Sequence, residues 1–148
     1  MSTTVGDLLQ IKGTKVETTT PSATILDAIK QMAERRIGCL AVVTKTGKLS
    51  GIVSERDCLW KVIATGQSPR THVVKEAMTP LKQMKTVTVD ISVDECMALM
   101  TDRRHRHLPV MAGDKLAGLI SIGDVVKYEI DAKESTIQSL EKYITGTF

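Results

Sequence analysis

The chain has 148 residues, of which 42% are apolar and 25% are charged, and its formal net charge is +3. This composition is ordinary for a folded globular protein, and the length fits one domain or two small halves that share a core. The chain contains only one Phe, two Tyr and one Trp. So few large aromatic side chains argue against a base-stacking nucleic-acid platform. The basic residues are scattered, so the mild positive charge favours anionic small ligands over DNA.

The three cysteines, Cys39, Cys58 and Cys96, form no CxxC pair, and each has apolar neighbours. This pattern is typical of small buried side chains in a reducing compartment rather than of a metal or redox site. No stretch reaches the roughly 18 continuous apolar residues of a membrane span, and the N-terminus lacks the layout of a signal peptide. We therefore expect a cytoplasmic protein with no membrane segment.

The first part of the chain predicts an alternation of strands and helices. Residues 5–11 form a short amphipathic lead-in that ends at Gly13, and the β-prone residues 15–21 predict a short strand and a turn. From Ser22 the apolar residues recur at spacings of three and four. This predicts a helix with Thr24 as N-cap, Asp27 in a variant of the capping box, and Gly38 as the stop.

Two strands and a second helix follow. Residues 39–43 (CLAVV) are a continuous apolar run, which predicts a strand buried on both faces. A turn at Gly47 leads to residues 49–54 (LSGIVS), which should pair back as a hairpin. The next helix is expected to begin at Glu55 and end at Gly66. Its predicted inner face consists of Cys58, Leu59, Val62 and Ile63.

The same order recurs from Met84 onward. Residues 85–90 predict the strand and turn again, Ser92 takes the place of Thr24, and HLPVM (107–111) stands where CLAVV stood. KLAGLIS then pairs back, and a helix opens over 123–130. Cys39 and His107 are 68 residues apart, whereas Asp57 and Asp124 are 67 apart, because the second hairpin turn is one residue shorter. Such changes are tolerated in surface loops.

The repeat predicts an α/β (α+β) fold of two pseudo-symmetric units, each strand-helix-strand-strand-helix. A unit of roughly 60 residues buries its core poorly alone, so the copies should pack sheet to sheet. The predicted boundaries are 5–66 for the first unit, 67–83 for a linker and lead-in, 84–130 for the second unit, and 131–148 for a C-terminal helix ended by Gly146. The apolar stripe of that helix should pack on other termini or on a second subunit.

Each unit closes with Gly, two aliphatic residues, Ser, two variable residues and Asp: GIVSERD at 51–57 and GLISIGD at 118–124. At a strand-to-helix junction the Ser can cap the helix and the Asp can lie in its first turn. The same geometry suits a ribose phosphate, because the carboxylate can accept from two ribose hydroxyls while Ser and free N–H groups face the phosphate. Capping alone remains the alternative.

At this point the sequence resembles a known family. EAMT at 76–79, RHRHLPV at 104–110 and GLISIGDVV at 118–126 are similar almost letter for letter to the consensus of the tandem cystathionine-β-synthase (CBS) domain, also called the CBS pair or Bateman module. The resemblance covers residues 5–130. We therefore expect a stand-alone regulatory module with two ligand clefts between the copies.

Members of this family typically bind adenosine compounds, so the resemblance implies AMP first, and otherwise ADP, ATP, NAD(H) or S-adenosylmethionine, with no metal required. Asp57 and Asp124 match the residue that takes the ribose hydroxyls, and Ser54 and Ser121 match the hydroxyl beside the phosphate. The remaining matched positions are Ile52 and Leu119, which pack on the base, and Ile37 and His105, whose backbone lines the base edge.

The second copy has Arg106 and His107 at the family's basic phosphate position, whereas the first copy has Gly38 and Cys39. This departure implies two chemically unequal clefts. Arg56 in the first motif is expected to supply the missing charge, where the second motif has Gly123.

The leading interpretation is an energy- or redox-sensing regulatory module that binds an adenosine nucleotide, changes shape and signals to an unknown protein partner. We also expect a homodimer with the helices after Asp57 and Asp124 at its interface. His105 and His107 alternate like metal ligands but have no evident third ligand. A nucleotide-acting enzyme lacks an identifiable nucleophile or acid–base pair. A nucleic-acid binder through Lys and Arg is the remaining, weaker alternative.

Overall fold

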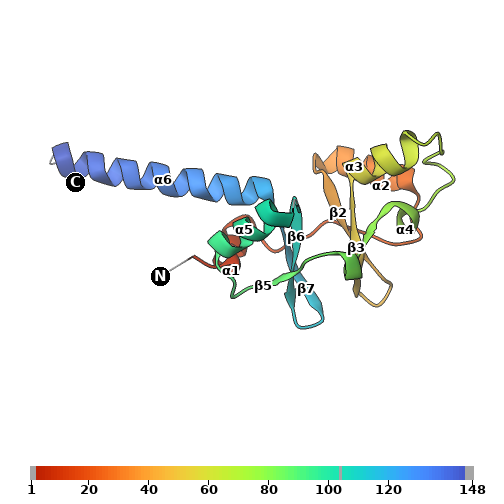
Figure 1. Ribbon diagram of the computed structural model, residues 1–148, viewed down its shortest axis with the longest axis horizontal. Coiled ribbons are helices and arrows are strands. Elements are labelled where there is room, and N and C mark those ends of the chain that lie inside the picture. The colour runs from red at the N-terminus through yellow and green to blue at the C-terminus, as the bar shows by residue number, and fades with distance from the viewer. Residues whose placement is uncertain (1–2, 104, 146–148) are drawn as a thin grey trace.

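The computed structural model of the chain describes residues 3–103 and 105–145. It has two α/β halves that follow one another along the long axis of the molecule (Figure 1). The first half contains a four-stranded sheet of order β1-β2-β3-β4, and the second a three-stranded sheet of order β5-β6-β7. The predicted mixed α/β class, with two repeated sheet-containing halves packed together, is confirmed.

The first half follows the predicted order of strand, helix, strand, strand and helix after its lead-in. Its elements are α1 (Val5–Lys12), β1 (Thr18–Thr19), α2 (Ile25–Arg35), β2 (Cys39–Val43), β3 (Leu49–Ser54), α3 (Glu55–Cys58) and the π-helical segment η1 (Leu59–Ile63). β1 runs parallel to β2, which pairs antiparallel with β3. The Thr24 hydroxyl accepts a 3.1 Å hydrogen bond from the Asp27 N–H and so caps α2 as predicted.

Two details of the first half differ from the prediction. α2 ends at Arg35 and not at Gly38: the next residue, Arg36, has a left-handed backbone (φ 54°) and caps the helix by donating its N–H to the Ala33 carbonyl. After Asp57 only Cys58 and Val62 face the core, while Leu59 and Ile63 are 55% and 45% exposed. The inner face of this segment is a single narrow stripe, because the wider π-helical turn follows α3 directly.

The second half repeats the pattern and ends in a long helix. Two elements of the connecting segment, α4 (Val74–Ala77) and β4 (Thr79–Pro80), pack on the first half. After the 3₁₀ turn η2 (Leu81–Gln83), the second half consists of β5 (Val87–Thr88), α5 (Val93–Arg103), β6 (His107–Ala112), β7 (Lys115–Ser121) and α6 (Ile122–Thr145). α6 is one continuous helix of 24 residues, rather than two helices meeting near residue 131, and it projects away from the sheets (Figure 1). The predicted stop at Gly146 lies outside the described residues.

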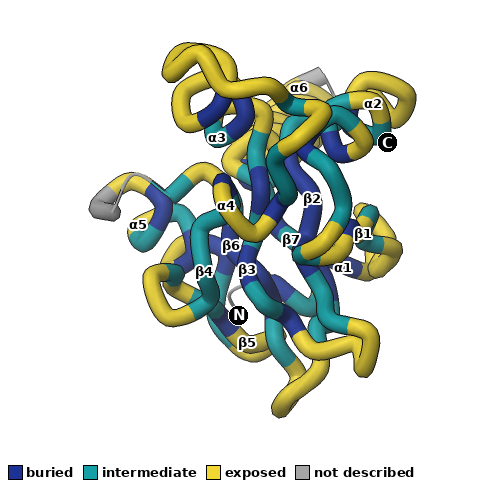
Figure 2. Tube along the Cα trace, turned by 90° about the vertical axis from the view of Figure 1, so that its right-hand side faces the viewer, coloured by how far each residue is buried: buried dark blue, intermediate teal, exposed yellow. Residues whose placement is uncertain are grey.

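Each half has its own hydrophobic cluster. The helix α1, which precedes the first half, packs into the cluster of the second half, and α4, which precedes the second half, packs into the cluster of the first. Residues Val5, Leu8 and Leu9 of α1 are buried in the second-half cluster, and Val74 and Ala77 of α4 in the first-half cluster. The Val5 N–H donates to the Ile91 carbonyl, and the Val74 N–H to the Ala23 carbonyl, both at 2.8 Å. Strands such as β2 run buried through the molecule (Figure 2). This exchange ties the two halves into one unit.

The glycine that opens each repeated motif permits a close approach by the exchanged segment. β4, which the sequence did not predict, pairs with β3 at Gly51 and Ile52. A β-carbon on Gly51 would lie 2.2 Å from the Thr79 carbonyl oxygen, and one on Gly118 would lie 2.6 Å from a methyl carbon of Leu9. Any larger residue at these positions would therefore have to displace the neighbouring segment.

Candidate functional site

Both repeated motifs form a capping box at the start of a helix. The Asp57 N–H donates to Ser54 Oγ at 3.2 Å, and the Ser54 N–H donates to Asp57 Oδ2 at 2.9 Å. The corresponding distances for Ser121 and Asp124 are 3.2 and 2.8 Å. These bonds satisfy N–H groups that a helix start leaves without partners. They also hold each carboxylate rigidly at the end of a strand.

A cavity of about 300 Å³ next to Asp57 is lined by residues from both halves. Its lining residues are Gly38, Ile52, Ser54, Glu55, Arg56, Asp57, Thr79, Met84, Lys85, His105, Arg106 and His107. Most of the residues predicted for a first cleft therefore meet here. The sequence interpretation missed Glu55, Thr79, Met84 and Lys85 as lining residues, although Thr79 closes the quoted EAMT stretch and Lys85 opens the second repeat.

The charge in this cavity differs from the expected distribution. Arg106 and His107 line the same cavity as Asp57, so the first cleft already has the basic residues that Arg56 was expected to replace. Arg56, Lys85 and Arg106 face only two carboxylates, those of Glu55 and Asp57, among its lining residues. Burial lowers the pKa of His107, and the nearby Lys12 ammonium lowers it further. The cavity thus combines one fixed carboxylate with an excess of positive charge, which suits an anionic ligand.

The Asp57 carboxylate keeps contact with this cavity although a lysine binds it. Lys61 Nζ lies 3.0 Å from Asp57 Oδ1 and 3.0 Å from the Ala77 carbonyl oxygen. Lys61 is one helical turn beyond Asp57 on the chain, so it reaches the carboxylate from the helix side, and it is not among the residues that line the cavity.

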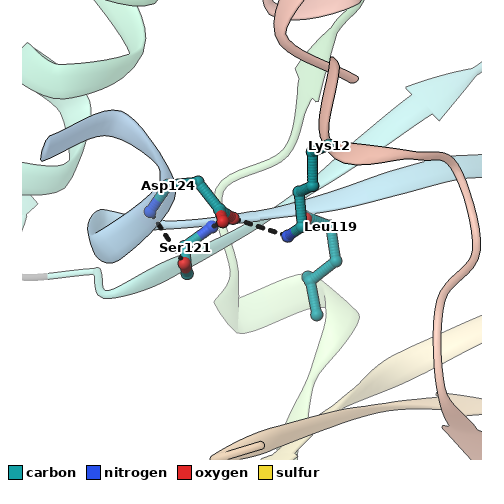
Figure 3. A network of polar contacts seen from close by, with 4 residues as sticks. All are labelled: Lys12, Leu119, Ser121 and Asp124. Atoms are coloured by element: carbon teal, nitrogen blue, oxygen red, sulfur yellow. Dashed lines mark hydrogen bonds and ion pairs between the residues drawn. The ribbon is translucent and has the colours of Figure 1, made fainter. Parts of the chain in front are cut away.

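The Asp124 carboxylate is held differently. Lys12 Nζ, at the end of α1, lies 2.5 Å from Asp124 Oδ2 and 2.6 Å from the Leu119 carbonyl oxygen (Figure 3). Burial of Asp124 raises its pKa, but the hydrogen bonds from Lys12 and from the Ser121 N–H outweigh burial and bring the pKa below its ordinary value. A cavity of about 470 Å³ that reaches Asp124 is lined only by residues of α1 and α6.

The other predicted positions on this side are partly dispersed. Leu119 and Ser121 adjoin Asp124, and Gly123 is exposed in the first turn of α6. Ile37 lines a separate cavity of about 710 Å³ beside α2 and η1. Lys12 was not predicted, because nothing local in the sequence indicates that it reaches a residue 112 positions away.

The three cysteines are buried free thiols, as predicted. Burial raises the pKa of Cys39 to about 12 and that of Cys58 to about 11. Within residues 3–103 and 105–145, no three His, Cys, Asp or Glu side chains are arranged to hold a metal ion. The same part of the chain contains no helix that is both long enough and apolar enough to cross a membrane.

Comparison with known proteins shows where this architecture occurs. The chain is 38% identical over 154 residues to "CBS domain-containing protein CBSX3, mitochondrial" of Arabidopsis thaliana, covering 99% of this chain and 74% of that protein. A putative signal-transduction protein with CBS domains from Burkholderia ambifaria is 46% identical, with a TM-score of 0.81 over 87% of this chain and 95% of the other. Since the name of CBSX3 includes a mitochondrial location, the cytoplasmic location stays a prediction.

A third relative was solved with a ligand. The crystal structure of CBSX2 in complex with AMP has a TM-score of 0.70 and 28% identity, covering 88% of this chain and 98% of that one. The sequence model of the CBS domain itself matches residues 4–63 and 74–131. With two matched copies, the repeated sheets and the paired capping boxes, this chain belongs to the CBS-domain family as a tandem pair.

Proposed function

We propose that this protein is a regulatory module that binds an adenosine nucleotide in the cavity beside Asp57. The observation that carries the proposal is the lining of that cavity: the capped carboxylate of one repeat faces the basic residues of the other. A nucleotide has the matching parts, namely a ribose diol that donates hydrogen bonds and phosphates that attract cations. The AMP complex of the related CBSX2 supports this class of ligand.

In this proposal each part of the nucleotide has a counterpart in the cavity. Asp57 accepts hydrogen bonds from the two ribose hydroxyls, while Ser54 and the start of α3 lie near the phosphate. Arg106 and Lys85 neutralise phosphate charge, and Ile52 packs against the base. The excess of basic residues favours AMP, ADP, ATP or NAD(H) over S-adenosylmethionine, because the sulfonium of the latter is a cation.

The ligand would act by coupling the two halves. The walls of the cavity come from both repeats, so a nucleotide that contacts both favours one relative orientation over others. A protein partner that binds that orientation more tightly would then sense the nucleotide. The CBS-domain relatives support a regulatory rather than a catalytic role, and we propose that the nucleotide is bound but not converted.

We further propose that two copies of the chain pair through the helices that follow Asp57 and Asp124. Leu59 and Ile63 are exposed on η1, and the residues 67 positions later, Val126 and Ile130, are equally exposed on α6. The same apolar pair therefore recurs on both repeats. Such a pseudo-symmetric surface matches a second copy of itself, which makes a homodimer the occupant of this face.

Thermal unfolding with AMP, ADP, ATP, NADH and S-adenosylmethionine tests the nucleotide proposal. At about 100 times its dissociation constant, a ligand of the folded state adds about 2.7 kcal/mol to the free energy of unfolding. We expect a rise in melting temperature with at least one anionic nucleotide, and chromatography of the mixture should recover that nucleotide unchanged. No rise with any of the five compounds would overturn the proposal, and conversion of the nucleotide would favour an enzyme.

A further inference from the structure

The two halves differ in the segment that lies beside the second strand of each hairpin, which is β3 in the first half and β7 in the second. In the first half, the chain leaves α4 after four residues and forms β4, which pairs with Gly51 and Ile52. In the second half, the equivalent helix α1 continues for eight residues and ends at Lys12. No strand pairs with β7 on that side among the described residues, and the Leu119 carbonyl accepts from Lys12 instead.

The sequence explains this difference. Pro80 cannot continue a helix, and the residue before a proline is disfavoured in helical conformation, so α4 must give way to an extended segment. The corresponding stretch of α1, residues 9–12 (LQIK), contains no proline or glycine and stops at Gly13, whose φ is 103°. The extra turn carries Lys12 to the end of β7, beside Asp124.

Lys12 lies where the second cleft would receive its ligand. By the repeat, Leu119 and Asp124 correspond to Ile52 and Asp57, which both line the first cavity. Lys12 Nζ binds the carboxylate and the Leu119 carbonyl together, and the Lys12 side chain is only 34% exposed. The Lys12 ammonium also acts to lower the pKa of Cys39 in the first half and of His107 in the second.

Resting on the proposed function, we propose that Lys12 occupies the second nucleotide cleft and that the protein therefore binds one nucleotide per chain, at Asp57. A ribose that approached Asp124 would meet the Lys12 ammonium, which bonds both the Leu119 carbonyl and Asp124 Oδ2, and displacing Lys12 would separate a partly buried ion pair. The lysine that binds Asp57 does not have this effect, because it approaches from the helix and leaves the carboxylate on the cavity wall. Lys12 thus selects which of two equivalent clefts is used.

Isothermal titration calorimetry with AMP, on the full chain, tests this assignment. We expect one AMP per chain in the natural protein and two in Lys12→Met, which keeps the aliphatic stem but removes the ammonium. Lys15→Met is the matched control, since Lys15 is exposed and pairs with Glu17 at 3.8 Å rather than with Asp124; it should bind one AMP. Two AMP in the natural protein, or one in Lys12→Met, would overturn the inference and leave the proposed function intact. If neither protein bound AMP or any of the other nucleotides, the proposed function itself would be overturned.

A second measurement tests the position of Lys12 without any ligand. Because the Lys12 ammonium lowers the pKa of His107, the imidazole of His107 should titrate at higher pH in Lys12→Met than in the natural protein. The titration can be followed by NMR of the histidine ring protons, with His72, whose ring contacts Ser68 and Thr71, as the internal reference. An unchanged titration of His107 would show that Lys12 is not in this cleft and would overturn the inference.

Discussion

The Lys12 ammonium and the Asp124 carboxylate are 2.5 Å apart, although 112 positions separate them in the sequence. Their contact joins the last turn of α1 to the first turn of α6, and so closes the second half around its own repeated motif. Among the residues that the structure describes, the corresponding carboxylate, Asp57, pairs only with Lys61 of its own helical segment. One repeat is thus held by a long-range ion pair and the other by a local one, which makes the two motifs physically unequal.

The Lys12–Asp124 contact should make stability depend on pH in the acidic range. The pKa of Asp124 is lower in the folded chain than its ordinary value of 3.8, so the unfolded chain takes up the proton first as pH falls. The stabilisation is therefore fully present above about pH 4 to 5 and is lost as pH falls through the folded-state pKa. In Lys12→Met the folded-state pKa of Asp124 rises towards its ordinary value, so less stability should be lost on acidification. Urea unfolding of both proteins between about pH 3 and pH 7 measures this, and parallel curves would contradict it.

Replacing Asp57 by Asn should weaken nucleotide binding without unfolding the protein. The amide oxygen of Asn can still accept from the Ser54 N–H, and its backbone N–H can still donate to Ser54 Oγ, so the capping box can persist while the negative charge is lost. We expect a loss of roughly 1–3 kcal/mol of binding free energy, the range for a charge-assisted hydrogen bond. Asp27→Asn, which changes the equivalent position in α2 away from the cavity, should leave the affinity unchanged. Calorimetry measures the nucleotide affinity of each variant. If Asp57→Asn binds as tightly as the natural protein, Asp57 does not have the ribose role.

The two motif glycines should differ in their sensitivity to substitution. Alanine at position 51 meets the Thr79 backbone oxygen at 2.2 Å, whereas alanine at position 118 meets the end of the flexible Leu9 side chain at 2.6 Å. Backbone cannot yield as a leucine side chain can. We therefore expect Gly51→Ala to cost about 3 kcal/mol and Gly118→Ala about 1 kcal/mol, the two ends of the range for overpacking. Urea unfolding ranks them, and the reverse order would contradict this account of the glycines.

The exposed apolar residues of η1 should be needed for self-association. We expect Leu59→Asp combined with Ile63→Asp to convert the dimer to a monomer, because two carboxylates would be buried at the interface without partners. Ile11→Asp is the control, since Ile11 is exposed on α1 and is 78% accessible. Sedimentation velocity in the micromolar range gives the mass of each. A monomeric natural protein, or a dimeric double variant, would contradict the proposed interface.

The buried thiols should be unreactive in the folded protein. Since the thiolate is the reactive form, a pKa of about 12 for Cys39 and about 11 for Cys58 leaves almost none of it at pH 8. A colorimetric thiol reagent should therefore react with all three cysteines in urea and with none rapidly in buffer. Fast reaction of Cys39, which begins β2 near the Asp57 cavity, would show that the cleft opens to solvent more than the structure indicates.

Much of the local structure could be predicted from the sequence, because its determinants lie within a few residues of one another. The apolar runs at 39–43 and 49–54 gave the bounds of β2 and β3 as they stand. Thr24, Ser54, Ser92 and Ser121 each accept from an N–H three residues later, so the helix starts follow from local hydrogen bonds. The repeat itself, and with it the paired sheets, could be recognised from the same short-range patterns.

Other features were decided only by the tertiary structure. The exchange of α1 and α4 between the two cores, the pairing of β4 with Gly51, and the meeting of Arg106 with Asp57 in one cavity all join distant residues. Pro80 and Gly13 indicate where a segment stops being helical, but not which surface that segment then covers. The sequence by itself therefore determined two equivalent carboxylates at two helix starts. Packing made them different, because one additional helical turn places the ammonium of Lys12 on only one of them.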